Sequence, residues 1–231
     1  MSDKKSLDNI KKLREITGVG FADCKLAITE NNGDIEKSIE YLRKKGIAKA
    51  SKKMSRVAAD GLVLLNEEKG CVSAIEINSE TDFVAKNKDF ILFCKEISEI
   101  NFENKGNLKS LNTSKMKNGK TVEENLITLI SKIGEKITIR RAKYFNNDGL
   151  NFFYVHNSTE MNVGKVISIV KLNKNESTDL KEIGTKLAMH IAAQSPMAID
   201  EKGIKKEILD KELEIIKDEL KNSGKKSDII E

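Results

Sequence analysis

The stretch from residue 61 to residue 87 reads Gly61-Leu-Val-Leu-Leu-Asn-Glu-Glu-Lys-Gly, Cys-Val-Ser-Ala-Ile-Glu-Ile and Asn-Ser-Glu-Thr-Asp-Phe-Val-Ala-Lys-Asn87. Two apolar runs on either side of a polar turn at 66–70 form the pattern of a β-hairpin. The third block is polar at 78–80, where the second strand should end. It offers Thr81 as the cap of one helix that carries Val84 and, further on, Phe90, Ile91, Phe93, Cys94 and Ile97. Two strands followed by a helix predict an antiparallel sheet with a helix layer on one face.

Upstream of this hairpin, residues 1–46 have the apolar spacing of three short helices. We expect the first helix to begin after Ser6 as its cap and the second to run from about residue 22 to residue 30. Asp34 should cap the third helix, and Gly46 suits the position just after its end. Three helices of this size predict a compact bundle near the lower size limit for independent folding.

Downstream of the hairpin, a polar stretch covers residues 101–120. Thr121-x-x-Glu124 then has the form of a capping box ahead of an apolar helix. After Gly134, the alternation from Ile137 onward is typical of a strand. These elements complete a first core subdomain, which we place at residues 61–145.

A second copy of the same plan begins near residue 150. Residues 151–156 and 165–172 form another expected strand pair, with Gly164 opening the second strand as Gly70 does in the first pair. A helix with one apolar face follows, from about residue 180. The pattern suggests a duplication and places a second core subdomain at residues 146–200.

The C-terminal segment, residues 201–231, is expected to be the first limb of a helical hairpin that is truncated. Residues 201–221 form an amphipathic helix with apolar residues at heptad spacing, namely Leu209, Leu213, Ile216 and Leu220. Such a stripe requires a partner helix, which makes a homodimer through 201–221 possible. Residues 227–228 look like the cap of a returning helix.

Positive charge is concentrated near the N-terminus of this 231-residue chain, whose formal net charge is +5. We name its densest part the basic stretch; its cations are Arg43, Lys44, Lys45, Lys49, Lys52, Lys53 and Arg56. Most of it falls in residues 47–60, which we expect to be a basic helical connector. We favour a solvated helix end over a nucleic-acid patch, because no aromatic side chains are interleaved with the cations.

Several classes of protein are disfavoured by what the sequence lacks. No apolar run approaches the roughly 20 residues of a membrane-spanning helix, and residues 1–12 lack the apolar stretch of a signal peptide. Cys24, Cys71 and Cys94 form neither a disulfide framework nor a zinc motif, as expected in a reducing cytoplasm. Without a phosphate loop, a nucleophile elbow or a paired-carboxylate motif, we expect no enzyme, no cofactor and no metal site.

Four segments carry a resemblance to a known family. They are residues 13–36, with Thr-Gly-Val-Gly-Phe and Asn-Asn-Gly-Asp; Ala-Ala-Asp-Gly at 58–61; Asn-Ser-Glu-Thr-Asp-Phe-Val-Ala-Lys-Asn at 78–87; and Met-His-Ile-Ala-Ala at 189–193, followed by Pro196. In this order, from about residue 7 to residue 221, the chain resembles the elongation factor Ts family. The resemblance implies an α+β fold, with an N-terminal three-helix ubiquitin-associated-like bundle, two small antiparallel-sheet-plus-helix subdomains and a partial helical hairpin.

The resemblance also implies a function without catalysis by the chain itself. Proteins of this family bind the GTPase elongation factor Tu in its GDP form, promote release of GDP and allow GTP to rebind. Their Thr-Asp-Phe-Val segment presses on the G domain and displaces elements that hold the magnesium ion of the nucleotide. By motif match this role falls on Asp82 and Phe83, with Thr81 and Val84 as framework. From residue types alone, Asp82 could merely complement a helix dipole and Phe83 could be a core residue.

Further contacts with the partner are implied for the loop Val19-Gly20-Phe21, for the nearby Arg14 and for His156. The alternative for Phe21 is that its ring is tucked into the bundle. His190 is expected to be partly buried and without a role at the site. Longer members of the family continue past a complete helical hairpin into a segment that also contacts the partner, which puts full activity of this chain in doubt.

Two other functions remain open from the sequence. One is a ubiquitin-associated-type adaptor with an unrelated core, which predicts no effect on GDP release. The other is an RNA-binding protein that uses the basic stretch, which predicts salt-dependent binding to RNA. The function implied by the resemblance to elongation factor Ts instead predicts saturable binding to a GTPase, with no membrane and no direct nucleic-acid contact.

Overall fold

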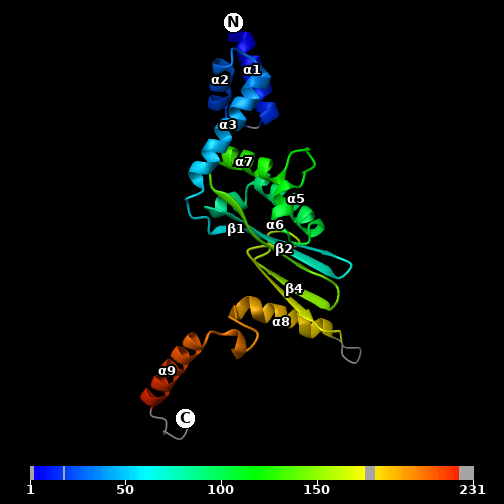
Figure 1. Cartoon of the computed structure of the whole chain (residues 1–231), viewed down its shortest axis with the longest axis vertical. Coiled ribbons are helices and arrows are strands. Elements are labelled where there is room, and N and C mark those ends of the chain that lie inside the picture. Colours follow the sequence, from blue (N-terminus) through cyan, green and yellow to red (C-terminus); the bar gives the residue numbers. More distant parts are fainter. Residues whose placement is uncertain (1–2, 18, 175–179, 224–231) are drawn as a thin grey trace.

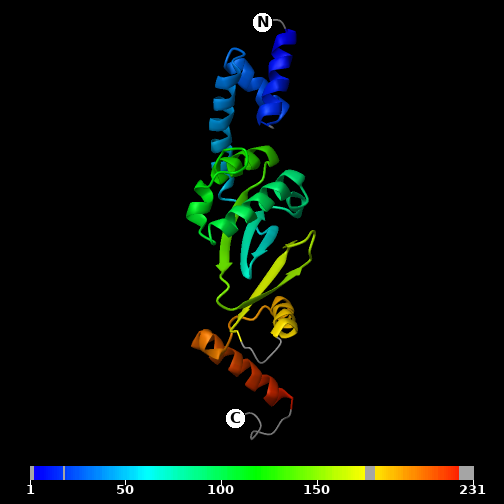
Figure 2. The same cartoon turned by 90° about the vertical axis from the view of Figure 1, so that its right-hand side faces the viewer.

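The computed structural model describes residues 3–17, 19–174 and 180–223. The molecule is elongated, with the N-terminal helices at one end and helix α9 at the other in both views (Figures 1 and 2). Between them lie two antiparallel sheets with helices packed on them, so the expected α+β fold is confirmed.

Three helices form the N-terminal bundle: α1 Asp3–Thr17, α2 Phe21–Glu30 and α3 Ile35–Lys53. Asp34 caps α3 as expected, because its Oδ1 accepts a hydrogen bond from the backbone N–H of Lys37 at 3.0 Å. Two predicted ends are wrong. Helix α1 already begins at Asp3, so Ser6 lies inside it, and α3 continues seven residues past Gly46 into the expected connector.

Gly46 has a packing role rather than a terminating one. It is buried against α7, where an added Cβ would lie 3.6 Å from Cβ of Ser131. The following residues include Ala48 and Ala50, which favour helix and carry α3 onward at little cost. The absence of a side chain at Gly46 lets two helix backbones come close, and this contact seats the bundle on the rest of the molecule.

The first sheet has the strand order β3-β2-β1-β5. Its strands are β1 Asp60–Glu68, β2 Cys71–Ser79, β3 Ile137–Phe145 and β5 Val163–Gly164. The β1–β2 hairpin is confirmed, but its turn is shorter than the predicted 66–70. Glu68 pairs with Cys71, so only Lys69 and Gly70 turn the chain, both at positive φ as the tightest hairpins require.

One face of this sheet is covered by helices (Figure 1). They are α4 Asp82–Ala85, α5 Lys88–Glu103, α6 Leu108–Thr113 and α7 Val122–Ile133. The single helix predicted after Thr81 is therefore wrong, because the chain breaks at Lys86-Asn87 and Asn87 caps α5 through bonds to the N–H groups of Asp89 and Phe90. The capping box of Thr121 and Glu124 at the start of α7 is confirmed.

The second sheet contains β4 Leu150–His156 and β6 Val166–Leu172, antiparallel as expected. Helix α8 Leu180–Gln194 covers one face of it, with Gly184 directly over the ring of Phe152. Gly164 does not open the second strand of this pair. It belongs to β5 and pairs with Val63 on the edge of the first sheet.

The C-terminal helix begins later than predicted. A short 3-10 helix, Glu201–Gly203, precedes α9 Lys206–Asn222, because Asp200 caps the short turn through the N–H of Gly203. Helix α9 has no buried residue, and its apolar side chains are largely exposed. The predicted cap at 227–228 lies outside the described residues. Within the described part of the chain, no helix has both the length and the apolar character needed to cross a membrane.

Candidate functional site

Phe83 is the most exposed phenylalanine side chain among the described residues, at 77% of its full accessibility. The two residues that follow it, Val84 and Ala85, are buried in the core beneath the single turn of α4. Because neighbouring positions on one turn face different directions, the two buried side chains point Phe83 outward. The alternative that Phe83 is a core residue is therefore wrong, whereas Val84 lies in the framework.

Asp82 and Lys86 flank this ring. The Nζ of Lys86 lies 2.9 Å from Oδ2 of Asp82 and 5.9 Å from the centroid of the Phe83 ring. An acid, an aromatic ring and a base thus share one exposed turn. Helix α4 has only four residues, so complementing its dipole explains little of why an acid stands at position 82.

Thr81 is not the side-chain cap that its position predicts. Its hydroxyl donates to Oε1 of Glu135 at 2.7 Å, and its backbone N–H donates to Oε2 of the same carboxylate at 3.0 Å. Glu135 comes from the turn between α7 and β3, 54 residues further along the chain. The Thr81 hydroxyl therefore bonds to a carboxylate distant in sequence and not to a backbone N–H of the helix that it precedes.

The loop Val19-Gly20-Phe21 and Arg14 lie in the bundle. The Phe21 side chain is 45% exposed at the start of α2, so the alternative that its ring is tucked into the bundle is wrong. Gly20 and Arg14 are exposed, while Val19 packs on the bundle core and lines a crevice of about 220 Å³ between α3 and α7. Within the described residues, no hydrogen bond or ring contact joins this loop to Phe83.

His156 stands exposed at the end of β4, with its Nδ1 3.2 Å from the hydroxyl of Tyr154. Its carbonyl oxygen accepts a bond from the N–H of Lys165, whose ammonium pairs with Asp60 at the start of β1. Asp60 lies opposite Ser79 in the hairpin register. His156 is thus connected through Lys165 and Asp60 to the strand end that leads into Thr81.

His190 is exposed on α8, so the expected partial burial is wrong. Its neighbour Ala188 faces the second sheet instead, where its carbonyl oxygen accepts a bond from the hydroxyl of Ser168. Among the described residues, no three histidine, cysteine or acidic side chains gather in a way that could hold a metal ion.

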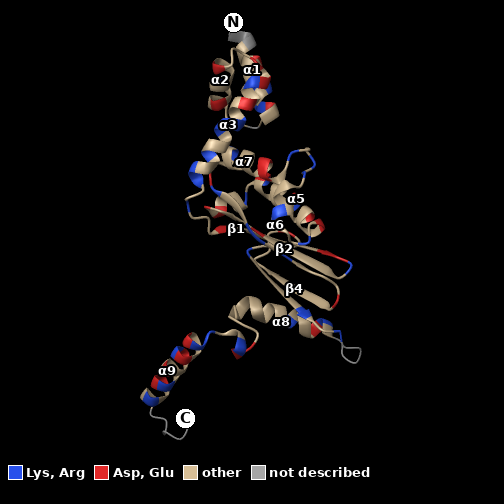
Figure 3. Cartoon of the chain, viewed as in Figure 1, with Lys and Arg blue, Asp and Glu red and all other residues tan. Residues whose placement is uncertain are grey.

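The basic stretch is largely occupied by contacts within the molecule. Figure 3 shows acidic residues close to it on the neighbouring helices. The contacts are Arg43 with Glu124, Lys44 with Glu40, Lys45 and Lys49 with Asp23, Lys53 with the carbonyl oxygen of Gly134, and Arg56 with Glu80. Cations that are already paired add less to the positive potential that attracts nucleic acid, so this arrangement does not favour the RNA-binding alternative.

Asp23 pairs with two cations of the basic stretch, Lys45 and Lys49, and these ion pairs lead to a testable prediction. The hydrogen bond from Lys49 lowers the pKa of Asp23, partial burial opposes the shift, and Lys45 adds to the lowering. Asp23→Asn should reduce the free energy of unfolding by about 0.5–1 kcal/mol at pH 7. Because the native pKa lies below the unfolded one, this loss is complete above the unfolded value of about 4 and disappears as the pH falls through the native value.

Urea unfolding of both proteins between pH 7 and pH 3, followed by circular dichroism, measures this difference. The exposed pair of Asp218 and Lys221 on α9 provides the control, since Asp218→Asn should change nothing at either pH. A loss for Asp23→Asn that is equally large at pH 3 and pH 7 would contradict the proposed origin in the ion pair.

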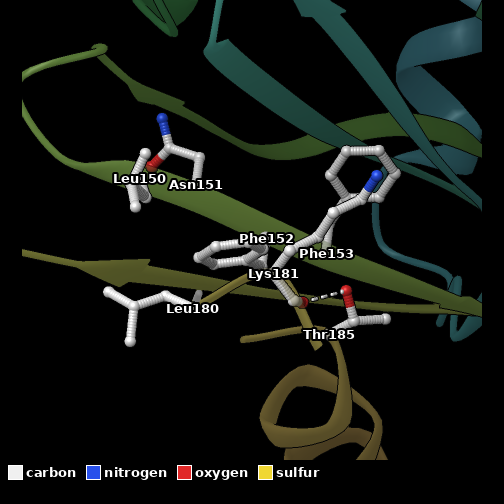
Figure 4. A pocket seen from close by; sticks show the side chains of 7 residues that line it. All are labelled: Leu150, Asn151, Phe152, Phe153, Leu180, Lys181 and Thr185. Atoms are coloured by element: carbon white, nitrogen blue, oxygen red, sulfur yellow. Dashed lines mark hydrogen bonds between the residues drawn. The ribbon is translucent and has the colours of Figure 1, made fainter. Parts of the chain in front are cut away.

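A hollow of about 490 Å³ lies between β4 and the start of α8. Figure 4 shows the side chains that line it, which are Leu150, Asn151, Phe152, Phe153, Leu180, Lys181 and Thr185. The hydroxyl of Thr185 is turned inward to the carbonyl oxygen of Lys181 at 3.0 Å. None of the site residues predicted from the sequence lines this hollow, and we assign it no function.

Sequence reasoning missed two residues at the exposed turn. Lys86 could have been found, because it stands four residues after Asp82, the spacing at which opposite charges meet on a helix. Glu135 gave no local signal, since its partner is distant in sequence.

Comparison with known proteins identifies the family. The family model described as elongation factor TS matches residues 80–231. Elongation factor Ts of Maricaulis maris is 40% identical over 227 residues, which cover 96% of this chain and 73% of the relative. The factors of Methylorubrum populi and Paracoccus denitrificans are 41% and 40% identical, over 94% and 96% of this chain and 71% and 74% of their own lengths. The chain therefore belongs to the elongation factor Ts family.

Proposed function

We propose that this protein binds elongation factor Tu in its GDP form and promotes release of GDP. The observation that carries the proposal is the exposed ring of Phe83 on a turn whose inner residues are buried. An aromatic side chain that projects from a firmly anchored turn is suited to enter a pocket of a partner and to displace what lies there.

The exchange step acts on a magnesium site that belongs to the partner. A bound Mg²⁺ neutralises phosphate charge, so shifting the elements that hold it weakens binding of GDP. In this proposal Phe83 makes the displacement, while Asp82 contacts polar groups of the G domain. Arg14, the loop 19–21 and His156 extend the contact along the molecule.

Thermodynamic linkage completes the cycle. A factor that binds the nucleotide-free GTPase more tightly than the GDP form must weaken GDP binding by the same ratio. GTP then refills the empty site and expels the factor. We propose that the chain itself needs no cofactor, performs no chemistry, acts in the cytoplasm and makes no direct contact with nucleic acid.

Helix α9 adds a proposal about assembly. Its apolar side chains include Leu213 and Ile216, which are 47% and 48% exposed. Apolar positions at heptad spacing favour pairing with another helix, and a second copy of the chain could supply it. Sedimentation over a range of concentrations tests this homodimer.

The first experiment is the dissociation rate of a fluorescent GDP from elongation factor Tu, with and without this chain. We expect strong acceleration at amounts of chain well below those of the GTPase, because each molecule is released and acts again. Tight binding without acceleration would contradict exchange by this chain. Neither binding nor acceleration would favour the adaptor or RNA-binding functions, which titration with RNA at two salt concentrations would then separate.

A further inference from the structure

Three segments far apart in sequence meet directly behind the exposed turn of Phe83. They are the residues just after α3, the end of β2, and the turn between α7 and β3. We call their contact the clasp and define it by Arg56, Glu80, Thr81, Glu135 and Lys136. Hydrogen bonds hold these segments together, in addition to apolar packing.

The bonds of the clasp are reciprocal. Glu135 reaches across to residue 81, where its two oxygens accept from the N–H and the hydroxyl of Thr81 at 3.0 and 2.7 Å. Glu80 reaches the opposite way, and its Oε1 accepts from the N–H of Lys136 at 2.5 Å. The end of β2 and the turn between α7 and β3 thus each supply one carboxylate and one backbone donor. Such crossed pairs fix the direction of both chains, because sliding one past the other breaks bonds at two places.

The third segment connects the clasp to the bundle. Nη1 of Arg56 lies 3.3 Å from both oxygens of Glu80. The ammonium of Lys136 donates to the carbonyl oxygens of Met54 and Arg56 at 2.7 and 2.8 Å. Helix α3 ends at Lys53, so these bonds hold the chain immediately after the helix that seats the bundle on α7.

The bonds within the clasp lie immediately before Asp82 and Phe83. Helix α4 is a single turn, and the side chain of its N-cap residue, Thr81, makes no capping bond, so its own hydrogen bonds orient it weakly. Val84 and Ala85 anchor the turn from below, whereas the strand that enters it is held by Glu135 and Glu80. Loss of either carboxylate would let the entering strand rotate while the core stayed packed.

We propose that Glu135 and Glu80 are positioning residues for nucleotide exchange, which set the direction in which Phe83 projects and join the Phe83 turn to the bundle as one rigid unit. This inference rests on the proposed function and deepens it. Phe83 can displace elements of the partner only if its own turn keeps its position, and the hydrogen bonds of the clasp hold that turn in place. The clasp therefore affects the displacement step and not the strength of binding.

The test compares Glu135→Ala with Glu135→Gln in the GDP-release assay, titrating each variant to saturation. Alanine removes both bonds to Thr81. Glutamine keeps both, because its amide oxygen accepts from the N–H of Thr81 and its amide nitrogen donates to the hydroxyl oxygen. We expect Glu135→Ala to lower the maximal rate roughly tenfold, with the half-saturating concentration nearly unchanged, and Glu135→Gln to restore the rate.

A matched control lies on α7, three residues before Glu135. Lys132 of α7 forms an ion pair with Asp89 at 2.8 Å and does not contact the clasp, so Lys132→Ala should leave the maximal rate unchanged. If Glu135→Ala fails to fold, Thr81→Val replaces it. This variant removes only the hydroxyl bond and should lower the maximal rate to a smaller extent.

Phe83→Ala, measured in parallel, distinguishes failure of the positioning role from failure of the proposed function. If Phe83→Ala slows release but the variants at Glu135 and Thr81 match the wild type, the positioning role is overturned and the proposed function stands. A glutamine variant as slow as the alanine variant would also overturn it, because the bonds would then not be what matters. If Phe83→Ala has no effect, the proposed displacement itself fails.

Discussion

Phe83→Ala is expected to slow the catalysed release of GDP from elongation factor Tu by on the order of 30-fold, the loss of about 2 kcal/mol that is typical of a central aromatic contact. The side chain is 77% exposed in the free protein, so its removal opens no cavity in the core. The thermal unfolding temperature should therefore remain within a degree or two of the wild type. Stopped-flow fluorescence of labelled GDP measures the rate.

Asp82→Ala is expected to have a smaller effect, and its interpretation needs a companion variant. The Asp82 carboxylate is paired with Lys86, so removing it also releases a cation beside the ring. Lys86→Ala leaves the Asp82 carboxylate in place, so the difference between the two variants gives the contribution of this carboxylate to the rate of GDP release. Ile183→Ala on α8, which truncates another exposed apolar side chain, serves as the general control. Wild-type exchange in the Asp82→Ala, Phe83→Ala double variant would remove both residues from the mechanism.

Gly61→Ala is expected to be the most destabilising single methyl addition in the first hairpin. Gly61 has φ +128°, a conformation that other residues rarely adopt, and an added Cβ would lie 2.1 Å from the carbonyl oxygen of Ile77. That oxygen belongs to the neighbouring strand and cannot move without breaking the β1–β2 register. Backbone strain and the clash together should cost about 3–5 kcal/mol of unfolding free energy.

Two other glycines calibrate this result by urea unfolding. Gly119 has φ +80° with nothing within 4 Å of an added Cβ, so its alanine variant carries the strain without the clash and should lose about 1 kcal/mol. Gly20 has φ −60° and open space, so Gly20→Ala should be nearly neutral. If Gly61→Ala cost no more than Gly119→Ala, the close approach of the two strands would not be the rigid contact described above.

The sequence predicted those elements whose signals are local. Asp34 and the pair of Thr121 and Glu124 cap their helices as expected, because a cap is formed by residues within one turn of each other. Asn87 is also a good cap placed before an apolar helix, so the break between α4 and α5 could have been read from residue types. Thr81 comes earlier in the chain and is also a residue type that caps helices, so the sequence predicts one continuous helix from it.

Tertiary contacts account for most of what was missed. Gly46 favours a helix end, but close packing on Ser131 makes a glycine useful inside the helix. Thr81 was identified as framework of the site, yet its partner Glu135 is distant in sequence and has no periodicity to reveal it. The exposure of Phe83 could not be decided either, because a phenylalanine at the start of an expected helix is more often buried, and its polar neighbours do not say which way the ring points.

Strand β5 is only two residues long, yet it determines when the first sheet is complete during synthesis. It pairs with Val63 and Leu64 in the middle of the outer edge of β1, and Lys165 next to it pairs with Asp60, 105 residues earlier in the chain. Until the ribosome has made this segment, β1 presents unpaired backbone groups along an apolar strand, a template for pairing with other nascent chains. A nascent chain released before residue 163 should therefore aggregate, although it already contains β1, β2 and β3 of the first sheet and all of its helices.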